Sequence, residues 1–455
     1  MRPPALGAVL LAVGVQIQVT LPIGGTGLRL NAADPLVACL AALLLAAALN
    51  GRGVRLRWRV PAVPAYAGLL TAVVLLSLVV GRMHLGEWHG WAVLNRAVGW
   101  PVLLAYGLAG AWVSTRLGEA GQRLFVKVLL GSATVILTVD GLPNLAAAFS
   151  VPIPLRLQDW EMAGAMGNSN ALAFFILVAL AAFLPMQASE RPLVSSRAAT
   201  FVLFVLLLSL WYTASRGGWL AGVILIAAAA LLRVVPWRAL LVAIAATAVA
   251  AFGPEVLDLA VRHLFGSDMF MVIRDATPGH SIGTLADLMS AGGTDDTANI
   301  ERLMLTREAL ALWREHMVLG TGLGGFLAQQ IGLHNQAMII HNTGLWILTE
   351  MGMVGAAAFA AVFAVLLRAF WPRPGKEGRR PPAIHAAAFL ALIGFAAMSL
   401  THEVLYQRIL WLLLGMALAL PAAASAPMGA DPGSESMDGT AAGADLEAEA
   451  RSDLR

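Results

Sequence analysis

The sequence predicts an all-α integral membrane protein with about twelve transmembrane helices and one large outer loop. Of its 455 residues, 59% are hydrophobic and only 13% are charged, which is far from the composition of a soluble domain. Apolar runs of about 17–20 residues, the length that crosses a bilayer as a helix, recur along most of the chain. The basic residues are nearly all arginines clustered between these runs, a pattern typical of membrane orientation and not of nucleic-acid binding.

The apolar runs are taken in order as candidate transmembrane helices. The first, over 5–23, is able to insert by itself, so a removable signal peptide is not required. The others cover 32–49, 62–81, 97–115, 124–141, 170–187, 200–214, 218–232, 239–253, 351–370, 383–399 and 408–424. The single cysteine, Cys39, lies within the second run, which excludes a disulfide framework and a cysteine metal site.

The arginines between the runs predict the orientation of the chain. The basic set of short loops contains Arg52, Arg55, Arg57, Arg59, Arg116, Arg123, Arg191, Arg197, Arg233, Arg238, Arg373, Lys376, Arg379 and Arg380. The opposite short loops contain only scattered arginines, namely Arg29, Arg82, Arg96, Arg156, Arg216 and Arg408. We therefore expect the first set and both termini in the cytoplasm, in agreement with an even number of spans.

One outer loop, from about 254 to 340, is large enough to fold. Its middle, "GGTDDTANIERLMLTREALALWREH", predicts a flexible start followed by an amphipathic helix. Arg302 and Trp313 are eleven residues apart and therefore share one face of that helix. Arg307 and Arg314 share another face.

We expect residues 1–424, including the 254–340 loop, to form one membrane domain. The tail over 425–455 is rich in Ala, Gly, Ser, Asp and Glu. Such a composition cannot bury enough apolar surface to fold, so the tail is expected to be disordered in the cytoplasm.

Polar residues interrupt the apolar pattern at the outer ends of several spans. The stretch "WYTASRGGWLAG" at 211–222 places Arg216 between two apolar runs, beside two glycines that permit a sharp turn. An arginine at the centre of a transmembrane helix costs about 2.5–3.5 kcal/mol on insertion scales. The stretch predicts either a tight turn with an arginine that reaches water or an anion site at the outer membrane surface.

A second polar stretch, "RLQDWEMAGAMGNSNALAFF", covers 156–175. Asn168 and Asn170 lead directly into an apolar run, so they are candidates for helix caps. Alternatively, they donate hydrogen bonds to a sugar or phosphate beside Arg156.

The stretch "GTGLGG" at 320–325 has the spacing G-x-G-x-x-G. A dinucleotide-binding fingerprint requires a strand before it and a helix after it. Here the expected amphipathic helix precedes it on the outer side, so we expect a turn that ends this helix.

The stretch "HNQAMIIHNTGLWILTEMGMVG" at 334–355 contains two His-Asn pairs, at His334 and His341. On a continuous helix the two histidines share a face, which leaves a metal site as one alternative, although Glu350 is the nearest acidic residue downstream. A neutral histidine at the outer surface is suited to accept a proton from a sugar hydroxyl. The third alternative is a histidine that only satisfies a helix end.

Together these motifs resemble the O-antigen ligase family, which belongs with O-antigen polymerases and O-linked protein oligosaccharyltransferases. The motif residues are Gly167, Asn168, Asn170, Ser215, Arg216, Gly217, Arg302, Trp313, Gly320, Gly322, His341, Asn342, Leu345, Leu348 and Gly352. The second His-Asn pair has the leucines and glycine in register, whereas the pair at His334 does not. The resemblance covers most of 160–420, and the earlier spans match only as generic apolar helices.

The resemblance implies a GT-C type membrane glycosyltransferase at the periplasmic face of the bacterial inner membrane. The donor is a glycan on undecaprenyl pyrophosphate, and ligases transfer it to lipid A–core. Neither a nucleotide sugar nor a metal or other cofactor is implied.

The family motifs also imply roles for individual residues. His341 is expected to be the general base, and Arg216 and Arg302 to hold the pyrophosphate, because arginine supplies fixed charge with a rigid fork of donors. In-line attack on the anomeric carbon then inverts its configuration. The expected substrate contacts are Arg156, Asn168, Asn170, Ser215, Asn342, His334 and Trp313.

Two related functions and one unrelated function stay open at this point. The polymerase and the protein oligosaccharyltransferase use the same donor chemistry, and the lack of a clear extra soluble domain favours the ligase. A transporter with about twelve spans would place polar positions near the bilayer midplane, often in two related halves. In this sequence the polar stretches lie at one face, and no repeat is visible.

Overall fold

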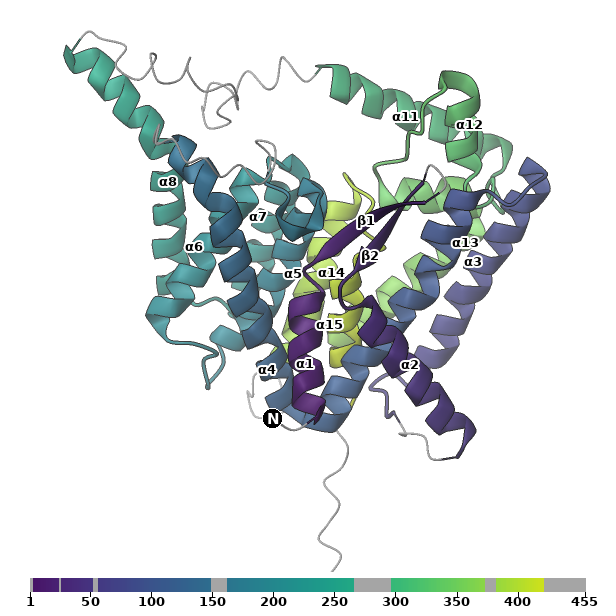
Figure 1. Cartoon of the computed structure of the whole chain (residues 1–455), viewed down its shortest axis with the longest axis horizontal. Helices are drawn as coiled ribbons and strands as arrows, with labels where there is room; N and C mark the ends of the chain where they lie inside the picture. The colour runs from purple at the N-terminus through teal and green to yellow at the C-terminus, as the bar shows by residue number, and fades with distance from the viewer. Residues whose placement is uncertain are drawn as a thin grey trace, which may run out of the picture. The chain divides into compact units, whose positions relative to one another are not determined.

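The computed structural model describes residues 3–23, 26–51, 56–148, 162–265, 296–372 and 382–420. These residues form thirteen α-helices and one two-stranded β-hairpin (Figure 1). Arg156 and the expected tail over 425–455 lie outside the described residues.

The N-terminal segment differs from the single span expected over 5–23. Helix α1 (Pro3–Gly14) ends early, and the chain then forms β1 (Gln18–Ile23) and β2 (Thr26–Asn31), which pair in antiparallel fashion. The span prediction is therefore wrong beyond α1. The segment contains β-branched residues, which favour strands, and the glycine-rich sequence "GGTG", which favours a hairpin, and these outweighed its apolar character.

The next helices follow the expected spans closely. They are α2 (Asp34–Leu49), α3 (Val63–Leu85), the π-helical turn η1 (Ala92–Ala97) and α4 (Gly99–Ala148).

Helix α4 is interrupted at Gly118, whose φ of 58° and ψ of −149° are not helical. The Gln122 side chain donates to Ser114 Oγ across this break at 3.0 Å. Two helices on either side of Gly118 thus correspond to the spans expected over 97–115 and 124–141.

The central part of the chain contains a short 3-10 turn, η2 (Gly164–Met166), followed by α5 (Ser169–Gln187), α6 (Ser196–Tyr212), α7 (Arg216–Leu231) and α8 (Trp237–Phe265). Helix α8 continues past 253, so the expected outer loop begins later than 254. Helix α5 is buried all around from Ala171 onward, as expected for a helix in the core of a bundle.

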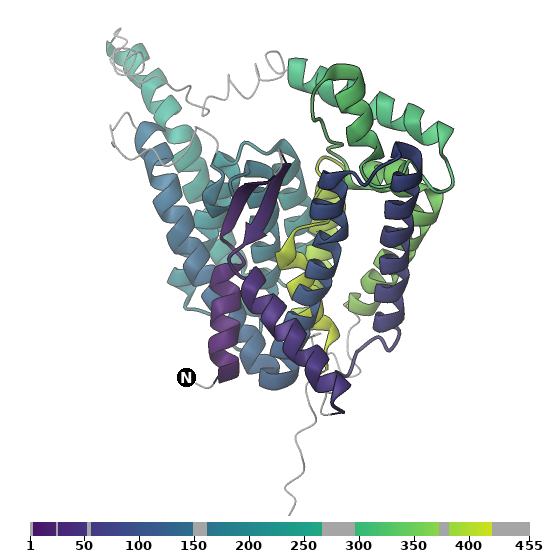
Figure 2. The ribbon, with the colours of Figure 1, turned by 45° about the vertical axis from the view of Figure 1, so that its right-hand side comes forward.

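The last helices are α11 (Asp296–Glu315), α12 (Gly325–His334), α13 (Thr343–Phe370), α14 (Ala383–Ser399) and α15 (Arg408–Leu418). Helix α11 confirms the expected amphipathic helix. Helices α11 and α12 lie beyond the ends of α3 and α13 (Figures 1 and 2). Helix α13 bends at Gly352, which has a φ of 64°, so its first turns are separate from the expected span over 351–370.

Four of the described segments are long and apolar enough to cross a membrane: Val63–Leu85, Ala92–Pro143, Ser169–Gln187 and Thr343–Phe370. The other apolar helical segments in the described ranges have 10–17 residues, and in α8 this segment is Trp237–Gly253. These helices indicate a multi-pass membrane protein. The count of about twelve crossings and the GT-C architecture stay predictions.

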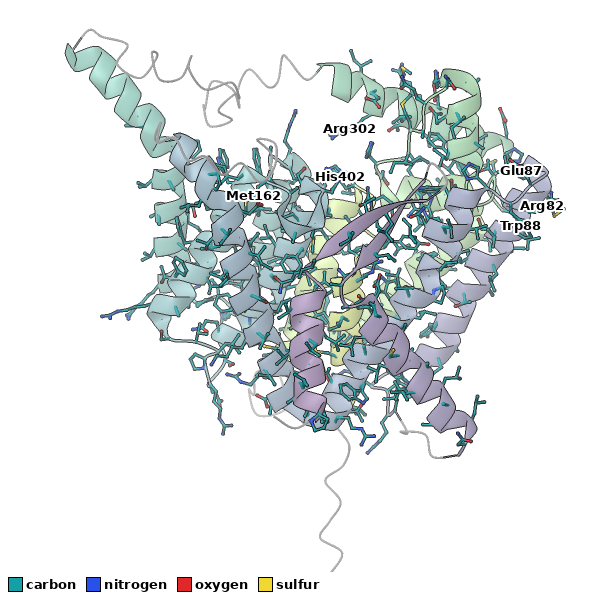
Figure 3. The ribbon with its side chains drawn as sticks, viewed as in Figure 1. Arg82, Glu87, Trp88, Met162, Arg302 and His402 are labelled. Carbon is teal, nitrogen blue, oxygen red and sulfur yellow. The ribbon has the colours of Figure 1, made fainter. Side chains whose placement is uncertain are left out.

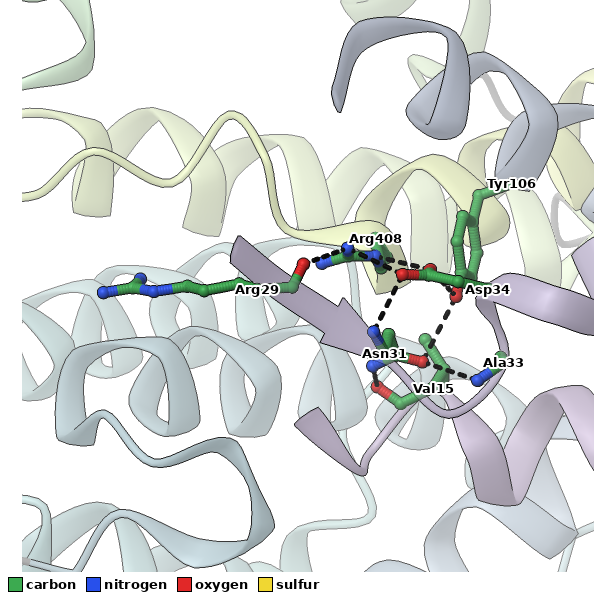
Figure 4. Close-up of polar contacts among 7 residues, drawn as sticks. All are labelled: Val15, Arg29, Asn31, Ala33, Asp34, Tyr106 and Arg408. Atoms are coloured by element: carbon green, nitrogen blue, oxygen red, sulfur yellow. Dashed lines mark hydrogen bonds and ion pairs between the residues drawn. The ribbon is translucent and has the colours of Figure 1, made fainter. Parts of the chain in front are cut away.

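A polar network fastens the N-terminal hairpin to the C-terminal helix (Figure 4). Arg408 at the start of α15 donates to both carboxylate oxygens of Asp34, at 2.8 and 2.9 Å. Tyr106 and the backbone N–H of Asn31 also donate to Asp34, each at 2.8 Å. Arg408 additionally donates to the carbonyl of Arg29 in β2. This network fixes the first residue of α15 and the loop that precedes it.

Candidate active site

Three helices of the bundle begin with a side-chain cap drawn from the sequence motifs. Asn168 accepts from Ala171 N–H at the start of α5, and Asn342 accepts from Leu345 N–H at the start of α13. Ser215 caps α7 in the same way. The cap alternative for Asn168 is thus confirmed. The first turn of each helix also carries a positive partial charge that favours anions.

The starts of α5 and α7 are joined directly. Ser215 Oγ donates to Asn170 Oδ1 at 2.8 Å. The structure therefore brings together Asn170 and Ser215, which were predicted as separate site residues. Arg216 follows immediately as the exposed first residue of α7.

The loop of residues 400–407 joins α14 to α15 in the chain. It also contacts the starts of both α7 and α13. A Cβ on Gly217 would lie 2.1 Å from Thr401 Oγ1, so the start of α7 presses directly on this loop. On the other side, Asn342 Nδ2 donates to the carbonyl of Leu400 at 2.8 Å. The starts of α5, α7 and α13 are thus tied together through the 400–407 loop.

The 400–407 loop brings His402 to His341. The two rings lie 6.2 Å apart between centroids, at an interplanar angle of 78°, which is a favoured edge-to-face arrangement. Thr343 Oγ1 donates to the His402 carbonyl at 2.9 Å and accepts from Val404 N–H at 3.1 Å. His402 was not among the predicted site residues.

Arg302 of α11 completes this cluster. Figure 3 shows Arg302 and His402 near each other, whereas Arg82, Glu87 and Trp88 lie away from them at the end of α3. Partial burial and then the Arg302 guanidinium lower the pKa of His341, against the opposing fields of Glu301 and Glu403. The structure therefore brings together His341 and Arg302, which the sequence predicted separately.

The surroundings also lower the pKa of His402. Burial, the Arg302 guanidinium and His341 lower the pKa of His402 to about 4. Both imidazoles are therefore neutral at pH 7. A neutral imidazole is the form that accepts a proton.

A buried arginine supports the cluster from below. Arg96 is 4% exposed, and its Nη1 lies 2.9 Å from Oε2 of Glu403, the neighbour of His402. The guanidinium carbon lies 4.6, 4.3 and 4.8 Å from the ring centroids of Trp91, Trp346 and Tyr406, respectively. These are cation–π distances, so the arginine is held on three sides.

The sequence reasoning missed Arg96 as a site-supporting residue and placed it only among the scattered outer arginines. The available signal was its position inside the apolar, tryptophan-rich stretch "WAVLNRAVGW". An arginine in such a setting must face a partner within the protein.

His334 occupies a different place from His341. Its Nε2 lies 3.1 Å from Oε1 of Glu308, and Gln330 donates to the other oxygen of the same carboxylate. These contacts join α12 to α11. Helix α12 ends at His334 and α13 begins at Thr343. His334 and His341 therefore do not lie on one continuous helix, which the two-histidine metal alternative required.

Trp313 is not brought to the cluster. Eleven residues separate it from Arg302 on α11, a rise of roughly 16 Å along the helix. Its indole N–H donates to the carbonyl of Met317 at 3.2 Å. Arg156, the remaining predicted contact, lies outside the described residues.

The glycines of the 320–325 stretch form a turn that packs against two membrane helices. Gly320 and Gly322 have φ values of 72° and 81°. A Cβ on Gly322 would lie 1.9 Å from the backbone nitrogen of Gly81 in α3, and one on Gly320 would lie 2.5 Å from the carbonyl carbon of Glu350. The expected turn is confirmed, and its glycines permit close backbone packing beneath α11.

Comparison with known protein families identifies one match. Residues 199–360 match the sequence profile of the family described as O-antigen ligase. The matched segment contains Ser215, Arg216, Arg302, His341 and Asn342, and it ends before the 400–407 loop. No curated protein matches the chain.

Proposed function

We propose that the chain is an O-antigen ligase of the bacterial inner membrane, because residues 199–360 match the profile of the O-antigen ligase family. The family implies glycosyltransferase activity of the ligase or polymerase type, on lipid-linked glycans and with a lipid acceptor. In our proposal the donor glycan is carried by undecaprenyl pyrophosphate, and the acceptor is lipid A–core at the periplasmic face.

One observation carries this proposal: the Arg302 guanidinium is close enough to His341 to lower its pKa, and His341 directly precedes the start of α13, which is tied to the starts of α7 and α5. The leaving group of the donor is a pyrophosphate, which needs fixed positive charge. Arg302 and Arg216 supply guanidinium groups, and the helix starts add the positive partial charge of their first turns. Fixed charges that meet the developing charge of a leaving group are often the largest catalytic contribution.

His341 acts as the general base in this proposal. Its neutral imidazole accepts the proton of the acceptor hydroxyl while the hydroxyl oxygen attacks the anomeric carbon. The carbon–oxygen bond to the pyrophosphate breaks on the opposite face, and the electron pair leaves with undecaprenyl pyrophosphate. This single in-line displacement inverts the anomeric configuration and requires no metal ion, since the arginines stabilise the leaving group.

The roles of the remaining predicted residues follow from their contacts. Asn168, Ser215 and Asn342 serve first as helix caps, and Asn170 is held by Ser215. These residues position the helix starts around the pyrophosphate. His334 joins α11 to α12 and thereby supports Arg302.

Transfer by the purified protein tests the proposal. The protein in detergent or nanodiscs receives undecaprenyl-pyrophosphate-linked glycan together with lipid A–core, a second lipid-linked glycan or an acceptor peptide in separate reactions. We expect glycosylated lipid A–core with an inverted anomeric linkage. Chain elongation alone would identify a polymerase, peptide glycosylation would identify a protein oligosaccharyltransferase, and a retained linkage would reject the single displacement.

A further inference from the structure

We propose that His402 is a positioning residue whose ring fixes the orientation of the His341 imidazole. This inference rests on the proposed function, in which His341 is the general base. It assigns a role to a residue outside the segment that matches the family profile.

The His341 ring lacks the usual means of orientation. Within the described residues it makes no hydrogen bond to another protein group, whereas a catalytic base is commonly held by a third group. Its ring contact is with His402, at 6.2 Å and 78°. His402 itself is only 6% exposed, so its ring has little freedom to move. The buried ring therefore provides a fixed edge against which the more exposed ring of His341 rests.

The backbone holds the two histidines in a constant relation. The residues directly after His341 are the ones that grip the 400–407 loop: Asn342 binds the Leu400 carbonyl, and Thr343 binds the His402 carbonyl and the Val404 N–H. A displacement of the His402 backbone would therefore also displace the start of α13. This coupling is what a positioning contact requires.

The charges around the pair favour a positioning role over proton transfer by His402. The groups that face the two rings are Arg302 and Glu301 from α11 and Glu403 from the 400–407 loop. Arg302 opposes protonation of both rings, and the pKa of His402 of about 4 makes this residue a poor proton carrier near pH 7. The His402 ring therefore acts through its shape and its fixed position beside His341.

Three substitutions at one position test the inference. His402→Phe keeps an aromatic edge against His341, His402→Leu fills much of the volume without that edge, and His402→Ala leaves a gap. The assay is glycan transfer at saturating and limiting acceptor, from pH 4.5 to 9, at equal amounts of folded protein.

For His402→Phe we expect a kcat within about threefold of the wild type and an unchanged acid limb. His402→Ala and His402→Leu should both lose roughly 10–100-fold in kcat with little change in KM, since misplacement of a reacting group by about 1 Å has effects of this size. Only His402→Ala should move the acid limb to higher pH, because the gap left by the smaller side chain increases the hydration of the partly exposed His341 ring and removes the opposing effect of burial on its protonation. If His402→Ala does not fold, the comparison of His402→Phe with His402→Leu still decides.

Two results would overturn the inference: a His402→Phe enzyme as impaired as His402→Leu, which would show that a ring nitrogen is required, or a His402→Leu enzyme as active as the wild type. These outcomes presuppose a wild type that transfers glycan. A wild type that transfers to none of the three acceptors would instead reject the proposed function, and this inference with it.

Discussion

The guanidinium of Arg96 lies 2.9 Å from the carboxylate of Glu403, inside a cage of three aromatic rings. The pair joins η1, in the N-terminal half of the chain, to the loop that carries His402. Removal of one partner of a buried ion pair leaves the other charge uncompensated, which costs more than removal of both.

We therefore predict that Arg96→Met destabilises the protein by about 3–5 kcal/mol. The double variant Arg96→Met/Glu403→Gln should recover part of this loss, since it no longer leaves the Glu403 carboxylate without its arginine. Thermal unfolding of the four proteins of the cycle in detergent measures the coupling. Strictly additive effects of the two substitutions would show that the pair does not act as a unit.

The orientation of the chain is open to labelling because Cys39 is the only cysteine. In a Cys39→Ser background, Glu315→Cys on α11 should react with an impermeant maleimide added to spheroplasts. Glu190→Cys, between α5 and α6, should react only after the membrane is permeabilised. Both positions are exposed, so accessibility to water does not differ in the folded protein. The opposite labelling pattern would reverse the topology and remove the periplasmic site.

Arg216 and Arg302 should each be required for transfer, and lysine should not replace them fully. Loss of a group that stabilises developing charge costs about 10²–10³-fold in kcat, so we expect this range for Arg216→Ala and Arg302→Ala. Lysine retains the charge but lacks the bidentate fork, and the lysine variants should be intermediate. Arg307→Ala, on the same helix as Arg302, provides a matched control for the loss of an exposed arginine. Normal rates in the two alanine variants would reject the anion site.

His341 and His334 should differ sharply in their effect on transfer. A general base contributes about 10²–10⁴-fold, so His341→Ala should lose nearly all measurable activity. His334→Ala loses a contact with Glu308 between α12 and α11 and should keep much of its activity. Transfer is measured at equal membrane abundance of both proteins. Wild-type activity in His341→Ala would remove the base from the mechanism.

The pH dependence of kcat/KM should reflect the lowered pKa of His341. The neutral imidazole is the active form, so activity is lost as the pH falls through the pKa of this group. Because burial and Arg302 lower that pKa from 6.5, the acid limb should lie below pH 6.5. Replacement of Arg302 by Gln removes the opposing charge and should move the limb of the residual activity upward. A downward shift in that variant would contradict the assigned field.

The sequence predicts the positions of most helices because long apolar runs have few alternatives in a membrane protein. It also predicts helix α11 and the separate motifs around Arg216, Arg302 and His341. The hairpin was missed because the first strand follows α1 almost directly, so that its apolar residues extend the apolar run of the helix. The β-branched residues of the first strand were the signal that it is not helical.

The support of the site was harder to predict because it depends on contacts distant in sequence. His402 and Glu403 are near no motif, and their importance arises from Thr343 and Arg96, which are far away along the chain. A lone arginine in an apolar stretch indicates that it has a partner within the protein. Which residue the partner is can be seen only in the folded structure. Likewise, Asn342 is recognisable as a helix cap, whereas its grip on Leu400 is a tertiary contact.

The ion pair between Asp34 and Arg408 sets an order of events during biosynthesis. Its partners are 374 residues apart, and a ribosome that adds 5–20 residues per second needs roughly 20–75 s to make that length. Throughout this interval the Asp34 carboxylate has no Arg408 to bind. The hairpin therefore lacks its contact with Arg408 until α15 has left the ribosome. The N-terminal end of the chain is synthesised first, but it forms this contact last.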